Sequence, residues 1–125
     1  MSRLGEPAEP FVERVRAVCV ALPEAYEEPA WVGVRWRVRK RTVAHVFSIE
    51  VDDEVVTAVM FRSTGPEHEV LRGIGPPYYA PWKDSVMLAL DDDTDWSEVA
   101  ELLTESYCFS APKKLIALLD RPDVS

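Results

Sequence analysis

The sequence predicts an α+β fold, an antiparallel sheet of about four strands with helices packed on it. Apolar residues recur every three or four positions near both ends of the chain, which is typical of amphipathic helices. Between them, from about residue 34, the apolar period changes to two, as in half-buried strands. The length of 125 residues fits one domain. We therefore expect residues 1–125 to form a single unit, in the order α-β-β-β-α-β-α-α, with a core over about 10–120 and loose tails at both ends.

The first helix should run from about Pro10 to Leu22 and end before a proline. Its buried stripe consists of Val12, Val15, Cys19 and Leu22. Residues 24–29 should then form a loop.

Two strands joined by a tight turn should follow this loop. In residues 34–39, three apolar side chains alternate with arginines, which indicates a half-buried strand. The second strand covers residues 43–51. A turn at Lys40–Arg41 would place Trp36 opposite His45, on the face that is buried. Neither turn residue is Gly or Asn, so a longer turn is the alternative.

The remaining elements alternate strand and helix. They are a central strand at Val55–Phe61, a short helix over about residues 64–73, a strand at Ser85–Leu90, a helix at about Trp96–Tyr107 and a last helix that ends near Leu119. Asp95 and Glu98 have the spacing of a capping box, which starts a helix. Thr64 and Glu67 have the same spacing.

Three stretches of the chain resemble the MmcQ/YjbR family. They are residues 16–25 (RAVCVALPEA), residues 31–38 (WVGVRWRV) and residues 95–115, which contain Asp95-Trp96, Leu102-Leu103, Glu105-Ser106-Tyr107 and Ala111-Pro112-Lys113-Lys114-Leu115. The resemblance extends from about residue 11 to 120 and implies a YjbR-like fold of the CyaY (frataxin-like) kind. Proteins of this family are commonly described as DNA-binding through a double-wing arrangement, and no enzyme activity follows from the resemblance. Relatives usually place a basic residue before the tryptophan that opens the fourth strand, whereas here Trp82 precedes Lys83.

The charge is distributed unevenly along the chain. The net charge is −8, yet residues 31–45 carry five basic side chains and no acid, which leaves −13 for the other residues. Residues 91–105 carry seven acids and no base. An acidic protein repels the phosphate backbone at long range, so contact with nucleic acid would depend on the local positive segment.

The basic strand is the leading candidate for a nucleic-acid site. Every second side chain of a strand lies on one face, about 6.6–6.8 Å apart, which is near the spacing of phosphates along one DNA strand. The side chains expected to contact phosphates are Arg35, Arg37, Arg39, Lys40 and Arg41. The competing interpretation is a solvated face whose arginines pair with the many acids of the chain.

Three lysines are candidate helpers: Lys83, Lys113 and Lys114. Lys113 and Lys114 fall in the first turn of the last helix, where free backbone N–H groups could help them to hold an anion. The alternative is that both side chains simply point into water.

The proline-rich loop at residues 76–83 favours a different function. Its aromatic residues are Tyr78, Tyr79 and Trp82. They could stack on bases, line a cleft for a small ligand or a protein partner, or form a hydrophobic lid over the sheet. A small-ligand or protein-interaction module is therefore the alternative to DNA binding.

No spacing of residues indicates a cofactor, a metal site or a catalytic group. Cys19 and Cys108 are isolated and are expected to be buried thiols. His45 should pack in the core and His68 should be exposed, so neither has metal-binding partners at a fixed spacing. No apolar stretch reaches the roughly 20 residues that cross a bilayer, and residues 1–7 lack the apolar core of a signal peptide. We expect a monomeric, cytoplasmic, non-enzymatic protein with no membrane partner.

Overall fold

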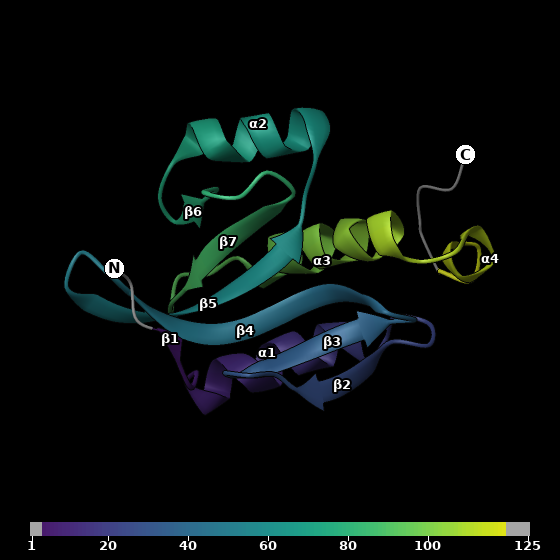
Figure 1. Ribbon diagram of the computed structural model, residues 1–125, viewed down its shortest axis with the longest axis horizontal. Helices are drawn as coiled ribbons and strands as arrows, with labels where there is room; N and C mark the ends of the chain where they lie inside the picture. The colour runs from purple at the N-terminus through teal and green to yellow at the C-terminus, as the bar shows by residue number, and fades with distance from the viewer. Residues whose placement is uncertain (1–3, 120–125) are drawn as a thin grey trace.

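The structure, a computed structural model, describes residues 4–119 (Figure 1). In chain order its elements are β1 (Leu4–Gly5), α1 (Glu9–Cys19), β2 (Tyr26–Pro29), β3 (Val34–Val38), β4 (Arg41–Val51), β5 (Glu54–Arg62), α2 (Gly65–Ile74), β6 (Tyr78–Tyr79), β7 (Ser85–Leu90), α3 (Trp96–Ser110) and α4 (Lys113–Ile116). The α+β class and the order of the longer elements are as predicted.

The sheet has seven strands, so the prediction of about four is wrong. Its order is β2-β3-β4-β5-β7-β6, every pair is antiparallel, and β1 pairs with β4 at Leu4 and Ile49. The three additional strands are β1, β2 and β6, of two, four and two residues. Strands this short carry no readable period of two, and β2 begins within the segment 24–29 that the sequence assigns to a loop. The central position predicted for Val55–Phe61 is confirmed, since β5 lies between β4 and β7.

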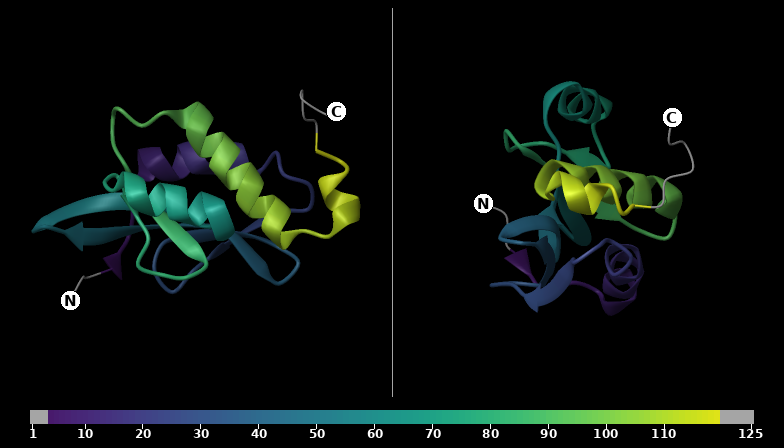
Figure 2. Two further views of the ribbon diagram at one scale, coloured as in Figure 1. Left: turned by 90° about the horizontal axis from the view of Figure 1, so that it is seen from above. Right: turned by 90° about the vertical axis from the view of Figure 1, so that its right-hand side faces the viewer.

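Helices cover one face of the sheet (Figures 1 and 2). The main apolar cluster joins side chains of α1, α2 and α3 to one face of the strands, and it includes Val15, Trp36 and Leu103. A second cluster on the opposite face contains strand and loop residues alone among those described, centred on Phe47, Ala58 and Met87. The sheet therefore has a helix face and an open face.

The helix ends differ from the predicted ones. α1 buries Val12, Val15 and Cys19 as expected, but it ends at Cys19 rather than Leu22. α3 continues to Ser110, and α4 is a single turn. Leu4–Gly5 and Glu9 belong to β1 and α1, so the predicted tail is wrong for residues 4–9. The predicted tails at residues 1–3 and 121–125 lie outside the described residues.

The hairpin of β3 and β4 turns one residue earlier than predicted. Its two central residues are Arg39 and Lys40, because Val38 pairs with Arg41. Trp36 then lies opposite Ala44, not His45. The register shifts between Trp36 and Arg37, so β4 carries one extra residue there, a β-bulge.

The bulge lets two consecutive residues of β4 face the helices. Val43 and Ala44 are both fully buried, Val43 with Tyr107 and Leu115, and Ala44 with Trp36. His45 is consequently on the open face, where its Nε2 lies 2.7 Å from the carbonyl oxygen of Val32. The prediction that His45 packs across from Trp36 is wrong, because a bulge reverses the alternation that the sequence suggests.

Other local predictions have mixed outcomes. Asp95 caps α3 by accepting hydrogen bonds from the backbone N–H groups of Ser97 and Glu98. Thr64 precedes α2 but makes no side-chain cap, and the Ser63 hydroxyl donates to Glu67 instead. Cys19 is buried as predicted, and desolvation raises the pKa of its thiol to about 12. Cys108 is only partly buried, so the prediction of a buried thiol there is wrong.

His68 is buried rather than exposed, so that prediction is also wrong. Its Nε2 lies 2.8 Å from the carbonyl oxygen of Trp82. This contact ties α2 to the loop between β6 and β7.

Gly33 brings the loop before β3 directly onto β4. Its φ is +75°, and a Cβ atom there would lie 1.9 Å from the carbonyl oxygen of Val46. Only glycine allows both this backbone conformation and this close approach. The loop carries Val32, which packs on the open face.

Replacing Gly33 by alanine should lower the free energy of unfolding by about 3 kcal/mol or more, because the new methyl group meets backbone and the left-handed conformation is strained. The matched control is Gly73→Ala in α2, where a Cβ atom meets nothing within 4 Å. That substitution should raise the free energy of unfolding by up to about 1 kcal/mol. Urea unfolding of both variants measures the difference; equal effects would contradict the close approach of this loop.

Candidate nucleic-acid interface

The edge strand β2 carries two consecutive acids that point to opposite faces of the sheet. Glu28 pairs with Arg35 in the register, and Glu27 pairs with Trp36. Because side chains alternate along a strand, Glu28 lies on the open face with the arginines, and Glu27 lies on the helix face with Trp36.

On the open face, Glu28 pairs with two arginines of the basic strand. Its Oε1 accepts hydrogen bonds from Arg35 Nε at 2.6 Å and from Arg37 Nη1 at 3.1 Å. Hydrogen bonding to Arg37, then to Arg35, holds the pKa of the Glu28 carboxyl below its ordinary value of 4.5. The candidate phosphate contacts Arg35 and Arg37 are therefore already paired within the fold.

On the helix face, Glu27 joins β2 to the first helix. Its carboxylate accepts from Arg16 Nε at 2.7 Å and Nη2 at 3.0 Å, and from Trp36 Nε1 at 3.2 Å. The bidentate contact with Arg16 lowers the pKa of Glu27. This pair fixes the edge strand against α1.

The tip of the hairpin is held in a strained conformation. Arg39 has φ +57° at the first central position of a two-residue turn, where glycine is the usual residue. The Tyr26 hydroxyl donates to the Arg39 carbonyl oxygen at 2.7 Å, and Arg37 Nη2 donates to the Lys40 carbonyl oxygen. Arg39 makes one loose ion pair, with Nη2 3.5 Å from Glu24, and its side chain is 47% exposed. The neighbours β2 and β3 thus impose the conformation that projects the basic turn.

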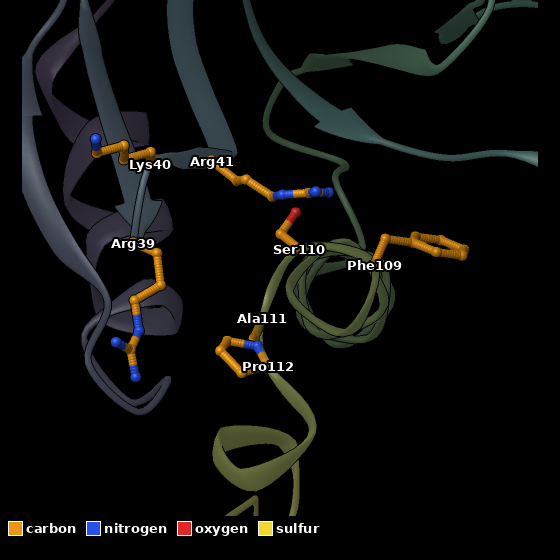
Figure 3. A pocket seen from close by; sticks show the side chains of 7 residues that line it. All are labelled: Arg39, Lys40, Arg41, Phe109, Ser110, Ala111 and Pro112. Carbon is orange, nitrogen blue, oxygen red and sulfur yellow. The ribbon is translucent and has the colours of Figure 1, made fainter.

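A hollow of about 620 Å³ separates this tip from the end of α3 (Figure 3). Its walls are the hairpin residues Arg39, Lys40 and Arg41 and the helix-end residues Phe109, Ser110, Ala111 and Pro112. Figure 3 shows Arg41 reaching from the start of β4 toward Ser110, with Arg39 directed away from that serine. Among residues 4–119, Lys40 and Arg41 make no ion pair, and both are exposed.

The three helper lysines do not gather at one place. Lys113 and Lys114 follow Pro112, a wall of the hollow, and both are exposed. They belong to a helix of four residues, which is too short to act as the anion-binding helix end that the sequence suggests. Lys83 lines a separate hollow of about 350 Å³ beside His68 and Trp82.

The aromatic loop lines a hollow on the open face. Its volume is about 760 Å³, and Tyr78, Tyr79 and Trp82 are among the lining residues. Tyr78 is buried, and its hydroxyl donates to Glu98 Oε2 at 2.6 Å, so this hydroxyl is already engaged. Tyr79 and Trp82 are the more accessible of the three aromatics.

A family model described as YjbR matches residues 20–109, which is more than half of the chain. The chain belongs to the YjbR family. No curated protein matches it. The YjbR match begins at the end of α1 and stops within the last turn of α3, so it covers the basic hairpin and the aromatic loop.

Neither a membrane span nor a metal cluster is found in the described part of this YjbR chain. None of its helices is both long and apolar enough to cross a bilayer. No three side chains of His, Cys, Asp or Glu come together there in a way that could hold a metal ion.

Sequence reasoning missed the residues that decide the charge of the surface. Glu27 and Glu28 read as loop residues, because β2 is short and ends in a proline. Their spacing from the arginines gave no signal, since the pairing depends on an antiparallel register across a turn. The helix-end wall of the hollow was missed because α3 runs three residues beyond its predicted end.

Replacing Glu28 by glutamine should lower the free energy of unfolding at neutral pH. It should also make this free energy less dependent on pH in the acid range. The folded pKa of Glu28 lies below 4.5, so its charged form stabilises the fold at pH values above 4.5. This contribution is lost as the pH falls through the folded value. The difference in the free energy of unfolding between wild type and Glu28→Gln should thus be largest at about pH 7 and absent at about pH 2.

Urea unfolding at a series of pH values measures this difference. Glu101→Gln, an exposed substitution on α3, is the control and should show a much smaller difference from wild type at every pH. A wild-type advantage over Glu28→Gln that stayed constant down to about pH 2 would contradict the ion pair.

Proposed function

We propose that this YjbR protein is a non-enzymatic, DNA-binding protein that contacts phosphates with the tip of the β3–β4 hairpin. The observation that carries the proposal is the set of exposed cations around the hollow of about 620 Å³ between this tip and the end of α3. They are Arg39, Lys40 and Arg41, with Lys113 and Lys114 beside them. The projecting hairpin also suits the wing that the family resemblance implies.

The pairing of Arg35 and Arg37 with Glu28 moves the proposed contact away from the strand. A phosphate approaching these arginines would have to displace a carboxylate or share the guanidinium groups with it. Lys40 and Arg41 have no such competitor among the residues described. They can therefore gain full Coulomb attraction to a polyanion.

The distance between the acidic run at residues 91–95 and the basic hollow supports DNA binding despite the net charge of −8. The acidic run at residues 91–95 precedes the start of α3, and the basic hollow lies at its end. A helix of 15 residues is about 22 Å long, which exceeds the Debye length of about 10 Å at 0.1 M salt. The acids at the far end of α3 are thus largely screened from a phosphate at the hairpin.

The positions of the histidines support a non-enzymatic role. The Nε2 atoms of His45 and His68 lie against backbone carbonyl oxygens of Val32 and Trp82. Neither Nε2 faces a serine or cysteine that it could activate as a general base.

We also propose that the α+β arrangement is of the CyaY-like kind that the family resemblance implies. The order of one helix, a run of antiparallel strands and a helix that returns across the same face supports this assignment. A projecting hairpin beside the end of the last long helix is the feature on which the binding proposal draws.

The double substitution Lys40→Ala/Arg41→Ala should weaken DNA binding at least about tenfold at low salt. Two phosphate contacts are lost, so the slope of log affinity against log salt should become about 2 units less negative. With about five cations at the site, the wild-type slope should be roughly −4. Fluorescence anisotropy with a labelled DNA duplex, between about 25 and about 200 mM salt, measures both quantities.

The charge-matched control is Arg35→Gln/Arg37→Gln, which also removes two positive charges but from the paired strand. This variant should keep its affinity within about threefold of wild type and keep its salt slope. Absence of wild-type binding at about 25 mM salt would remove the proposal. A larger loss of DNA affinity in Arg35→Gln/Arg37→Gln than in Lys40→Ala/Arg41→Ala would mean that the strand makes the contact.

A further inference from the structure

We propose that the hollow on the open face is a binding site for a small organic cation with an apolar body. It lies between β1 and the end of β4 on one side and the β6 loop on the other, and its volume of about 760 Å³ is within the usual range for small-molecule sites. It is separate from the hairpin hollow and shares no lining residue with it. The proposal is therefore independent of DNA binding.

The floor and walls of this site are apolar. Ile49 and Met87 are buried on the open face, and Val51 packs against the same cluster. Leu4 and Pro81 complete the apolar lining, and Leu4 is 45% exposed although it is a large hydrophobic side chain. Covering these surfaces with an apolar ligand would remove them from water.

Two aromatic side chains are held at the rim by backbone contacts. Tyr79 pairs with Met87 in the sheet, and the carbonyl oxygen of Trp82 lies 2.8 Å from His68 Nε2. On the helix face, the Tyr78 hydroxyl bonds to Glu98 and anchors the same strand. Trp82 is 41% exposed although its loop is tied on both sides. The rim is thus preorganised and accessible.

The charged lining residues are all acidic. Glu50 and Asp52 line the hollow, but Ile49 and Val51 face it, so the alternation of β4 places the Glu50 side chain on the helix face and leaves Asp52 as the acid of the site. No lysine, arginine or histidine is among its lining residues within the described chain. Lys83 and Arg72 line a different hollow, which shares Ala80, Pro81 and Trp82 with this one. Carboxylates and aromatic faces both attract cations, whereas an anion would meet repulsion without a partner.

These features together select the chemical class of the ligand. An apolar body would cover Leu4, Ile49 and Met87, and a single positive charge would lie near the Asp52 carboxylate and the faces of the aromatic rings. A neutral apolar molecule would gain only the first contribution. An organic anion would gain affinity from the burial of its apolar body and lose affinity through charge repulsion.

The test uses benzyltrimethylammonium as the cationic probe, with benzyl alcohol and phenylacetate as neutral and anionic probes of similar size. Each is titrated into the full-length ¹⁵N-labelled protein, and amide shifts are followed by NMR. The cation should shift residues 49–52 and 79–82, and it should bind at least about fivefold more tightly than phenylacetate. Equal affinities for the cation and the anion, or no shifts in these segments, would overturn the proposal.

Two variants separate the aromatic contribution from the acidic one. Trp82→Ala should weaken cation binding about tenfold, whereas Trp31→Ala, a control at a tryptophan that is 89% exposed and outside the hollow, should not change it. Asp52→Asn should reduce the preference for the cation over benzyl alcohol by about fivefold, and asparagine tolerates the φ of +50° at residue 52. An unchanged preference would overturn the role of the carboxylate. Shifts of residues 79–82 that depend on protein concentration without any probe would show that a second copy covers this face, which would also overturn the proposal.

Discussion

The charge of the molecular surface depends on the pairing of one edge strand with its neighbour. β2 places Glu28 against Arg35 and Arg37 on the open face, and it places Glu27 against Arg16 on the helix face. The two acids of this four-residue strand therefore pair with three arginines on two sides of the sheet. Ion pairs this exposed to water contribute little to stability, so their main effect is on charge and orientation. The end of the hairpin stays positive because Lys40 and Arg41 make no ion pair with the acids of β2.

A β-bulge and one buried serine fix the position of the hairpin relative to the end of α3. The bulge at Val43 interrupts the strand ladder, and the Ser106 hydroxyl donates to the Val43 carbonyl oxygen at 2.6 Å. The same oxygen atom of Ser106 accepts from the backbone N–H of Arg62 at 2.9 Å. A fully buried hydroxyl thus satisfies backbone groups of two strands, as buried polar groups require. Four residues later, Ser110 forms one wall of the basic hollow.

The long elements could be predicted from sequence periodicity, and the short ones could not. The stripe of α1, the apolar β5 and the Asp95 cap each carry a local signal that does not depend on distant partners. β1, β2 and β6 have no such signal, because their pairing is decided by the strands beside them. The bulge could not be predicted either, because both possible registers of the hairpin place apolar residues inward.

The same difference explains the outcome for the candidate site. The basic residues of the hairpin are evident in the sequence, but their freedom to bind depends on acids that come into contact only after folding. The aromatic loop was evident too, whereas its partner wall on β1 and β4 depends on strand pairing that the sequence does not show. Residue types at both sites could be read from the chain, and their partners required the fold.

The most direct measurement of the central claim is an NMR titration of the ¹⁵N-labelled protein with a short DNA duplex at low salt. If Glu28 occupies the arginines of β3, the largest amide shifts should fall at residues 39–41 and 109–114, around the basic hollow. Residues 26–37, where Glu28 holds the arginines, should change little. The largest shifts along residues 26–37, with the hairpin tip unaffected, would contradict this account of the surface.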